Sequence, residues 1–179
     1  MKICLLGYMG CGKTYIGSLL SKSIKYNHID LDKLIEITSK MSISDYFKIY
    51  GEYNFRILEN NLLSFITKNS NIKDCIFSLG GGTPCFFNNL KLIKKNYISI
   101  YIKVNHKVLY ERLSIDNDNR PLLKNKKGKV LYDFIKNHIK LRNKFYKKAN
   151  YIIDTKNMDY IEVSDYIKNL LKIKNVKNI

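Results

Sequence analysis

A phosphate-binding loop is the first feature of this 179-residue chain that points to chemistry. Residues 7–14 read GYMGCGKT and satisfy the pattern G-x-x-x-x-G-K-S/T, after a short apolar run and before a helical stretch. Glycines allow successive backbone N–H groups to turn toward a polyphosphate, the lysine reaches its terminal phosphates, and the Thr14 hydroxyl can ligate Mg²⁺. The loop therefore predicts a binding site for a nucleoside triphosphate.

Two carboxylates follow at the end of the second predicted strand. Asp30 and Asp32 stand two residues apart, and in an extended chain both would point to one face. In a doubly wound sheet this edge adjoins the phosphate loop. One carboxylate could then hold Mg²⁺ through water, and the other could accept a proton from an attacking hydroxyl. The alternative is that Asp32 only caps the next helix.

Arginine is scarce although the chain is strongly basic. Thirty-two lysines and arginines against 15 acidic residues give a net charge of +17, and only four of the 32 are arginines. Lysine, asparagine, isoleucine and tyrosine can all be encoded by A and T alone, so we favour an A+T-rich coding sequence over a nucleic-acid-binding surface as the cause. The arginines then stand out, because their planar fork of donors fits carboxylates and phosphates. They are Arg56, Arg112, Arg120 and Arg142.

Alternating strands and helices must position these residues. The predicted strands are 2–6, a short one that ends at Asp30, 75–79, 97–104 and 151–154. The predicted helices are 13–24, 31–39, 44–50, 52–68, one that includes 108–113, 131–147 and 159–172. In helix 52–68, Phe55, Leu58, Leu62 and Phe65 recur at helical spacing and should face the core. This alternation predicts a parallel sheet covered on both faces, within one domain.

Several classes of protein are disfavoured by what the sequence lacks. Its four cysteines show no C-x-x-C spacing, which argues against a zinc site or a disulfide scaffold, and Cys4 and Cys75 should be buried in strands. No apolar run approaches the roughly 20 residues that span a bilayer, and the start MKICLLGYMGCGKT does not resemble a signal peptide. A regulatory GTPase would be expected to carry N-K-x-D, which is absent. A cytoplasmic small-molecule kinase fits this length.

Four further motifs carry a resemblance to a known family. They are G-E-x-x-F-R-x-x-E at 51–59, G-G-G at 80–82, R-P-L-L at 120–123 and R-x-x-x-Y at 142–146. With the phosphate loop and D-L-D at 30–32, the chain resembles the shikimate kinases from Ile3 to about Thr155. The resemblance implies a three-layer α/β/α P-loop NTPase fold, like that of nucleoside-monophosphate kinases, with a central five-stranded parallel sheet and a mobile lid.

On the nucleotide side, the resemblance implies that the phosphate loop wraps the phosphates of ATP. One Mg²⁺ per active site would bind Thr14 and, through water, Asp30. Arg112 would lie against the adenine, and Arg120 would come down with the lid onto the transferring phosphoryl group. The implied ATP-binding residues are Gly10, Cys11, Gly12, Lys13, Thr14, Tyr15, Arg112 and Arg120.

On the acceptor side, the resemblance implies a shikimate pocket. Arg56 and Arg142 would clamp the carboxylate, Gly81 would offer its backbone N–H, and Asp32 would act as the base for the 3-hydroxyl. The implied substrate-binding residues are Asp32, Arg56, Gly80, Gly81, Gly82 and Arg142, and the implied catalytic residues are Lys13, Asp32 and Arg120. Simpler roles stay open for three arginines. Arg56 could only pair with Glu52 or Glu59, Arg112 could lie on the surface beside Glu111, and Arg142 could belong to a solvated basic face.

The implied activity is ATP-dependent phosphorylation of shikimate to shikimate 3-phosphate, a step in chorismate and aromatic amino-acid biosynthesis. One domain, residues 1–179, would contain a substrate-binding region at about 31–60 and a lid at about 116–130. We expect a monomer whose partners are ATP and shikimate, with no specific nucleic acid and no membrane. The alternatives are a kinase of another small hydroxylated acceptor, such as gluconate, and a nucleic-acid-binding P-loop protein.

Overall fold

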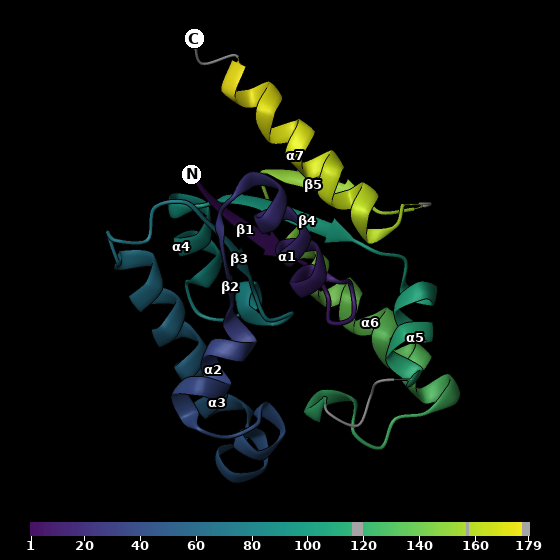
Figure 1. Ribbon diagram of the computed structural model, residues 1–179. Coiled ribbons are helices and arrows are strands. Elements are labelled where there is room, and N and C mark those ends of the chain that lie inside the picture. The colour runs from purple at the N-terminus through teal and green to yellow at the C-terminus, as the bar shows by residue number, and fades with distance from the viewer. Residues whose placement is uncertain (116–119, 157, 177–179) are drawn as a thin grey trace.

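Strands and helices follow one another along the chain, as the sequence predicted (Figure 1). The computed structural model describes residues 1–115, 120–156 and 158–176. The strands are β1 (Lys2–Leu6), β2 (Asn27–Asp30), β3 (Cys75–Ser78), β4 (Ile98–Lys103) and β5 (Tyr151–Asp154). The helices are α1 (Lys13–Ile24), α2 (Leu31–Ser39), α3 (Ile43–Lys68), α4 (Asn89–Asn96), α5 (His106–Ile115), α6 (Gly128–Tyr146) and α7 (Tyr160–Val176), with short 3₁₀ turns η1 (Thr83–Cys85) and η2 (Pro121–Leu123).

The five strands form one parallel sheet in the order β2-β3-β1-β4-β5, which confirms the predicted sheet. The central strand β1 places Ile3 opposite Ile76 of β3 and Ile98 of β4. Strands that are buried on both faces read as continuous apolar runs, which explains KICLL in β1. The phosphate loop follows β1, the D-L-D motif joins the end of β2 to the start of α2, and the three glycines follow β3. A parallel sheet brings all three segments to one edge.

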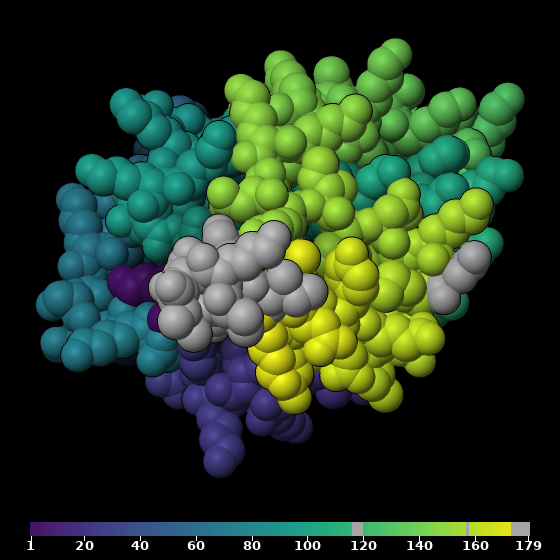
Figure 2. All heavy atoms as spheres, turned by 90° about the horizontal axis from the view of Figure 1, so that it is seen from above, coloured from purple at the N-terminus to yellow at the C-terminus, as the bar shows by residue number. Residues whose placement is uncertain are grey.

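The core divides into two clusters, because successive side chains of β1 point to opposite faces of the sheet. Ile3 and Leu5 belong to a cluster with apolar residues of α1 and α7, whereas Cys4 and Leu6 pack with α2, α3 and α4. Figure 2 shows the yellow atoms of α7 against the indigo atoms of the N-terminal part, where α1 and α7 are in contact. These layers confirm the predicted α/β/α architecture. No helix in the described ranges has the length and apolarity needed to cross a membrane.

The cysteines are mostly enclosed. Cys4 and Cys75 have no exposed surface, as predicted, and Cys11 is 1% exposed. Cys85 is partly buried, and all four are free thiols.

The predicted helices 44–50 and 52–68 join in α3, but the axis breaks between them at Gly51. This residue has φ 77° and ψ 171°, a backbone conformation essentially confined to glycine. The break turns the first part of α3 toward α2, and Figure 1 shows both at the lower left, away from the sheet.

The predicted core stripe of this helix was wrong at one end. Phe55 is 3% exposed, but Phe65 is 69% exposed, and Leu58 and Leu62 are only partly buried. The buried face is centred on a different set that includes two charged residues. This set is Phe55, Arg56, Glu59, Leu63, Ile66 and Thr67. Counting apolar residues missed this face, because an ion pair between Arg56 and Glu59 occupies part of it.

The predicted lid region lies between α5 and α6 (Figure 1). Of residues 116–130, those at 116–119 lie outside the described residues. The remainder contains η2, and α6 begins at Gly128 rather than near residue 131.

Candidate active site

The phosphate loop presents the start of α1 to a cavity. Gly10 and Gly12 have φ of 77° and 94°, in the left-handed region where glycine carries no penalty. Gly12 is the N-cap and gives no side-chain cap, so the first N–H groups of α1 are free of such a bond and can bind an anion. Lys13 Nζ lies 3.0 Å from the Gly7 carbonyl oxygen and 3.1 Å from that of Tyr8. The lysine is thus folded over the loop.

This loop lines a cavity of about 400 Å³, here named the phosphate-loop cavity. Seven predicted ATP-binding residues line it together with Asp30. They are Gly10, Gly12, Lys13, Thr14, Tyr15, Arg112 and Arg120. The eighth, Cys11, does not line it, because its side chain is buried behind the loop with Sγ 3.6 Å from Lys13 Nζ.

Asp30 connects this cavity to the start of α2. Its Oδ2 accepts a hydrogen bond from the Thr14 hydroxyl at 2.5 Å, and its Oδ1 accepts from the backbone N–H groups of Asp32 and Lys33 at 3.0 and 3.2 Å. Asp30 is therefore the N-cap of α2. The alternative in which Asp32 caps the helix is wrong.

Asp32 itself lies in the first turn of α2, not in an extended strand. The expected geometry, two carboxylates on one face of β2, was also wrong, because the cap formed by Asp30 starts the helix at Leu31. Burial raises the pKa of Asp32 to about 6, helped by the negative charges of Asp30 and Glu59 and opposed by Lys13 and Arg56. At neutral pH this carboxylate is ionised, yet it is more basic than an ordinary aspartate.

A second cavity, of about 150 Å³, lies beside the first and is here named the arginine cavity. All six predicted substrate-binding residues line it. They are Asp32, Arg56, Gly80, Gly81, Gly82 and Arg142. Four residues line both cavities: Met9, Asp32, Gly81 and Arg120. The two cavities therefore meet at a carboxylate and an arginine.

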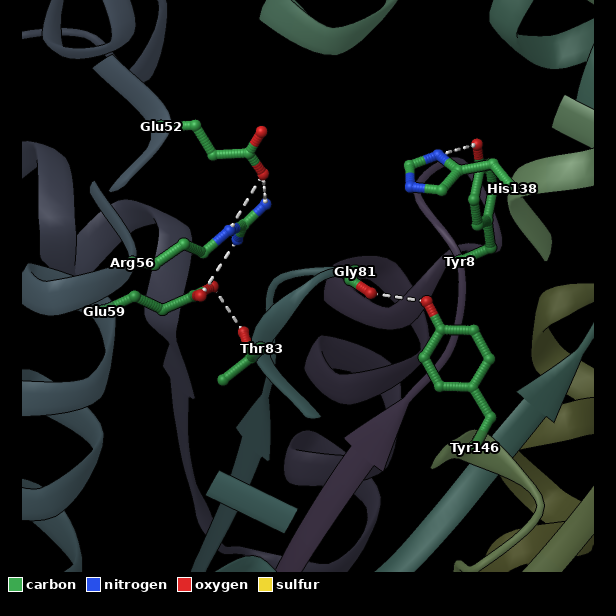
Figure 3. Close-up of polar contacts among 8 residues, drawn as sticks. All are labelled: Tyr8, Glu52, Arg56, Glu59, Gly81, Thr83, His138 and Tyr146. Carbon is green, nitrogen blue, oxygen red and sulfur yellow. Dashed lines mark hydrogen bonds and ion pairs between the residues drawn. The ribbon is translucent and has the colours of Figure 1, made fainter. Parts of the chain in front are cut away.

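Arg56 lines the arginine cavity and is held by two glutamates, Glu52 and Glu59 (Figure 3). Its guanidinium lies 2.9 Å from Glu52 and 2.9 Å from Glu59, and Thr83 donates to Glu59 at 2.5 Å. The ion pairs that were the simpler alternative thus exist, but they orient the arginine toward the cavity. A Cβ at Gly82 would lie 2.6 Å from Arg56 Nη2, so a side chain there would displace the guanidinium from this position.

Arg142 is buried without such partners. It is 4% exposed, and Nη1 has no hydrogen-bond partner among the described residues. None of the ion pairs found in residues 1–115, 120–156 and 158–176 includes it. The solvated basic face is therefore wrong for Arg142. A buried guanidinium with an unpaired N–H group that opens into a cavity fits an anionic ligand.

Gly81 lies where the phosphate loop and α6 come together. A Cβ there would lie 3.0 Å from the Met9 nitrogen and 3.5 Å from Arg142 Nη1. The Tyr146 hydroxyl donates to the Gly81 carbonyl oxygen, and the tyrosine has no exposed surface (Figure 3). The motif R-x-x-x-Y thus supplies one residue to the cavity and one to its support.

Arg112 lines the phosphate-loop cavity next to Gly10 and Tyr160. Its Nη1 donates to the Gly10 carbonyl oxygen at 3.2 Å, and its guanidinium lies 4.9 Å from the ring centroid of Tyr160. It is therefore not a surface residue that only neighbours Glu111. Sequence analysis missed Tyr160 and Met9 as lining residues. Tyr160 follows β5, far along the chain from the phosphate loop, and has no local sequence signal.

The sheet order, the phosphate loop after β1 and the adjoining arginine cavity define a P-loop kinase of the nucleoside-monophosphate-kinase-like class. Residues 9–172 match the model of the shikimate kinase family, and the chain belongs to this family. The shikimate kinase of Flavobacterium psychrophilum is 42% identical over 165 residues, 90% of this chain and 95% of the relative.

Solved structures agree with this assignment. The crystal structure of shikimate kinase from Bacteroides thetaiotaomicron has a TM-score of 0.86 and 31% identity, and covers 98% of both chains. The Acinetobacter baumannii shikimate kinase in complex with shikimate has a TM-score of 0.88 and 27% identity, over 97% of this chain and 93% of that one.

Proposed function

We propose that this chain transfers the terminal phosphoryl group of ATP to the 3-hydroxyl of shikimate, giving shikimate 3-phosphate and ADP for chorismate and aromatic amino-acid biosynthesis. The observation that carries the proposal is the buried guanidinium of Arg142, whose Nη1 has no hydrogen-bond partner among the described residues, in a cavity that also contains Arg56 and Asp32. Two arginines suit the carboxylate of the acceptor, and one carboxylate suits its hydroxyls.

The acceptor would be aligned from two ends. Arg56 and Arg142 bind the carboxylate, and Asp32 accepts a hydrogen bond from the 3-hydroxyl. As the hydroxyl oxygen bonds to the γ-phosphorus, the bond from that phosphorus to the bridging oxygen breaks and ADP leaves. The hydroxyl proton passes to Asp32. Lys13 and Arg120 stabilise negative charge on the moving phosphoryl oxygens.

The donor set near Thr14 fits Mg²⁺. The Thr14 hydroxyl, a hard oxygen ligand, and the Asp30 carboxylate, which would hold the ion through water, already lie together in the phosphate-loop cavity. Bound Mg²⁺ would neutralise charge on the β- and γ-phosphates.

The protein would act as a monomer in the cytoplasm. The active site needs no second subunit, because a single chain lines both cavities. Within one domain, residues 1–179, the substrate-binding region at about 31–60 contributes Asp32, Phe47 and Arg56 to the arginine cavity. The lid region at about 116–130 contributes Arg120, which lines both cavities. Closure of this segment would exclude water and limit ATP hydrolysis.

A coupled assay of ADP release tests the proposal. With ATP and Mg²⁺, we expect turnover with shikimate and none above background with gluconate or AMP, and no stimulation by oligonucleotides. Phosphorylation of gluconate or AMP with a higher kcat/KM than that of shikimate would contradict the assignment.

A further inference from the structure

A tyrosine of the phosphate loop lies behind Arg142. Tyr8 is 2% exposed and lines neither cavity. Its ring centroid lies 5.7 Å from Arg142 Cζ, within cation–π range. Its hydroxyl lies 3.0 Å from Nδ1 of His138, and the two rings meet edge to face (Figure 3). Tyr8 thus contacts α6 at two residues one helical turn apart, His138 and Arg142.

The two arginines of the arginine cavity are therefore held by different means. Arg56 is fixed by Glu52 and Glu59, which also share its positive charge. For Arg142, the described contacts are aromatic and neutral, so its charge is left for a ligand. A glutamate in this place would compete with a bound carboxylate for the guanidinium, whereas a tyrosine ring does not.

We propose that Tyr8 and His138 are positioning residues that fix the guanidinium of Arg142 for the acceptor carboxylate. Tyr8 supports the guanidinium with its ring face, and its hydroxyl fastens the ring to the turn of α6 that precedes Arg142. This inference rests on the proposed function, because it assigns the anion at Arg142 to the acceptor.

The protonation of the pair suits this role. Burial lowers the pKa of His138, and with the added effect of the positive charges of Arg142 and Arg56 this pKa is about 4. Burial also raises the pKa of Tyr8 well above its ordinary value. Both groups are therefore uncharged at neutral pH and add neither an opposing nor a competing charge beside Arg142.

Substitutions at Tyr8 separate the ring from the hydroxyl. Tyr8→Phe keeps the ring face but loses the bond to His138, and Tyr8→Leu loses both. We expect KM for shikimate to rise about threefold in the first variant and about tenfold or more in the second. KM for ATP should stay within about twofold, although Tyr8 belongs to the phosphate loop. Since the chain has no tryptophan, direct shikimate binding is measured by titration calorimetry.

A matched control is Tyr132, which lies on α6, the helix that also contains His138 and Arg142. The Tyr132 hydroxyl lies 2.9 Å from His106 Nε2, with ring centroids 5.4 Å apart, and neither residue lines the two cavities. Tyr132→Phe should leave both KM values unchanged. The proposal is overturned if Tyr8→Phe and Tyr132→Phe behave alike, or if the Tyr8 variants raise KM for ATP as much as KM for shikimate.

Combined variants keep the test decisive if Tyr8→Leu does not fold. Because Tyr8 acts through Arg142, adding Tyr8→Phe to Arg142→Lys should raise KM for shikimate less than it does in the wild type. Likewise, KM for shikimate in the double variant His138→Leu, Tyr8→Phe should be no higher than in the single variant with the higher KM. Full additivity in both cycles contradicts the proposal. Absence of shikimate turnover by the wild type would instead contradict the proposed function, which the same assay reports first.

Discussion

Asp32 shows how much of a residue's chemistry comes from its surroundings. The sequence identified this aspartate as the candidate base, and the structure places it between the two cavities. What the sequence could not supply is the raised pKa, because it depends on burial and on Glu59, which lies 27 positions along the chain. Tyr8, His138 and Tyr160 were missed for the same reason, since their contacts join distant segments.

The pKa of Asp32 predicts the pH dependence of catalysis. In the proposed mechanism the ionised carboxylate is the active form, so kcat/KM for shikimate should increase about tenfold per pH unit below pH 6 and level off above it. Steady-state rates from pH 5 to 8.5 with saturating ATP measure this profile. A profile that stays flat down to pH 5 would show that Asp32 does not titrate in this way.

The same shift predicts a stability effect with a defined sign. Between pH 3.8 and about 6 the folded chain keeps a proton on Asp32 that the unfolded chain releases, so this group lowers the free energy of unfolding as pH rises. Asp32→Asn should therefore raise the melting temperature at pH 7.5 while abolishing turnover. The difference from wild type should vanish below pH 4, where both forms are neutral, and thermal scans at the two pH values check this.

Removing Arg56 should destabilise the fold much more than removing Arg142. Arg56→Ala leaves Glu59 buried without its partner, which should cost about 3–5 kcal/mol. Arg142→Ala removes a buried charge that has no ion-pair partner among the described residues, so the free energy of unfolding should fall little or rise. Both variants should lose shikimate binding. Urea unfolding and calorimetry measure the two effects, and equal destabilisation would contradict the difference in support.

At the scale of elements, local signals placed all five strands and every helix of the described residues except α4, but missed how α2 begins and which face of α3 is buried. The prediction of a break between two helices at Gly51 was correct, because the backbone conformation of a glycine is a local property. The start of α2 at Leu31 depends on a cap formed by Asp30, and the buried face of α3 includes the ion pair between Arg56 and Glu59. Apolar periodicity reports neither.

The break in α3 should be sensitive to any side chain at position 51. A Cβ on Gly51 meets nothing within 4 Å, so Gly51→Ala tests backbone strain without a clash. We expect a loss of about 1–3 kcal/mol in the free energy of unfolding. KM for shikimate should rise too, because Ile43 and Phe47 line the arginine cavity from the part before the break. Lys48→Ala, an exposed change on that part, is the control and should alter neither quantity.

At the scale of the whole molecule, the net charge of +17 comes mainly from lysines spread along the chain, whereas the four arginines gather at the two cavities. The scarcity of arginine in the sequence correctly singled out these residues, since all four line one or both cavities, while lysines occupy many exposed positions. No pattern in the sequence could show that the two cavities share Met9 and Gly81, because this follows from the packing of the loops at the sheet edge.

Salt should therefore affect this protein only modestly. Exposed charges are screened beyond about 8–10 Å at physiological ionic strength, while buried guanidinium groups are not. Raising NaCl from about 10 to 150 mM should change kcat little and increase each KM by less than about tenfold. Micromolar duplex DNA binding that persists at physiological salt and competes with ATP would show instead that the lysines form a nucleic-acid surface.

The enclosed thiols make this chain a convenient subject for site-directed labelling. Cys4, Cys11 and Cys75 have at most 1% of their surface exposed, and burial raises the pKa of Cys85 to about 11. Alkylating reagents attack thiolates, and a thiol of this pKa holds about a hundredth of the thiolate of an ordinary cysteine. A single cysteine in place of the exposed Lys124 would therefore react with a maleimide dye ahead of the native ones. Movements of the segment before α6 could then be followed by fluorescence in an otherwise unaltered enzyme.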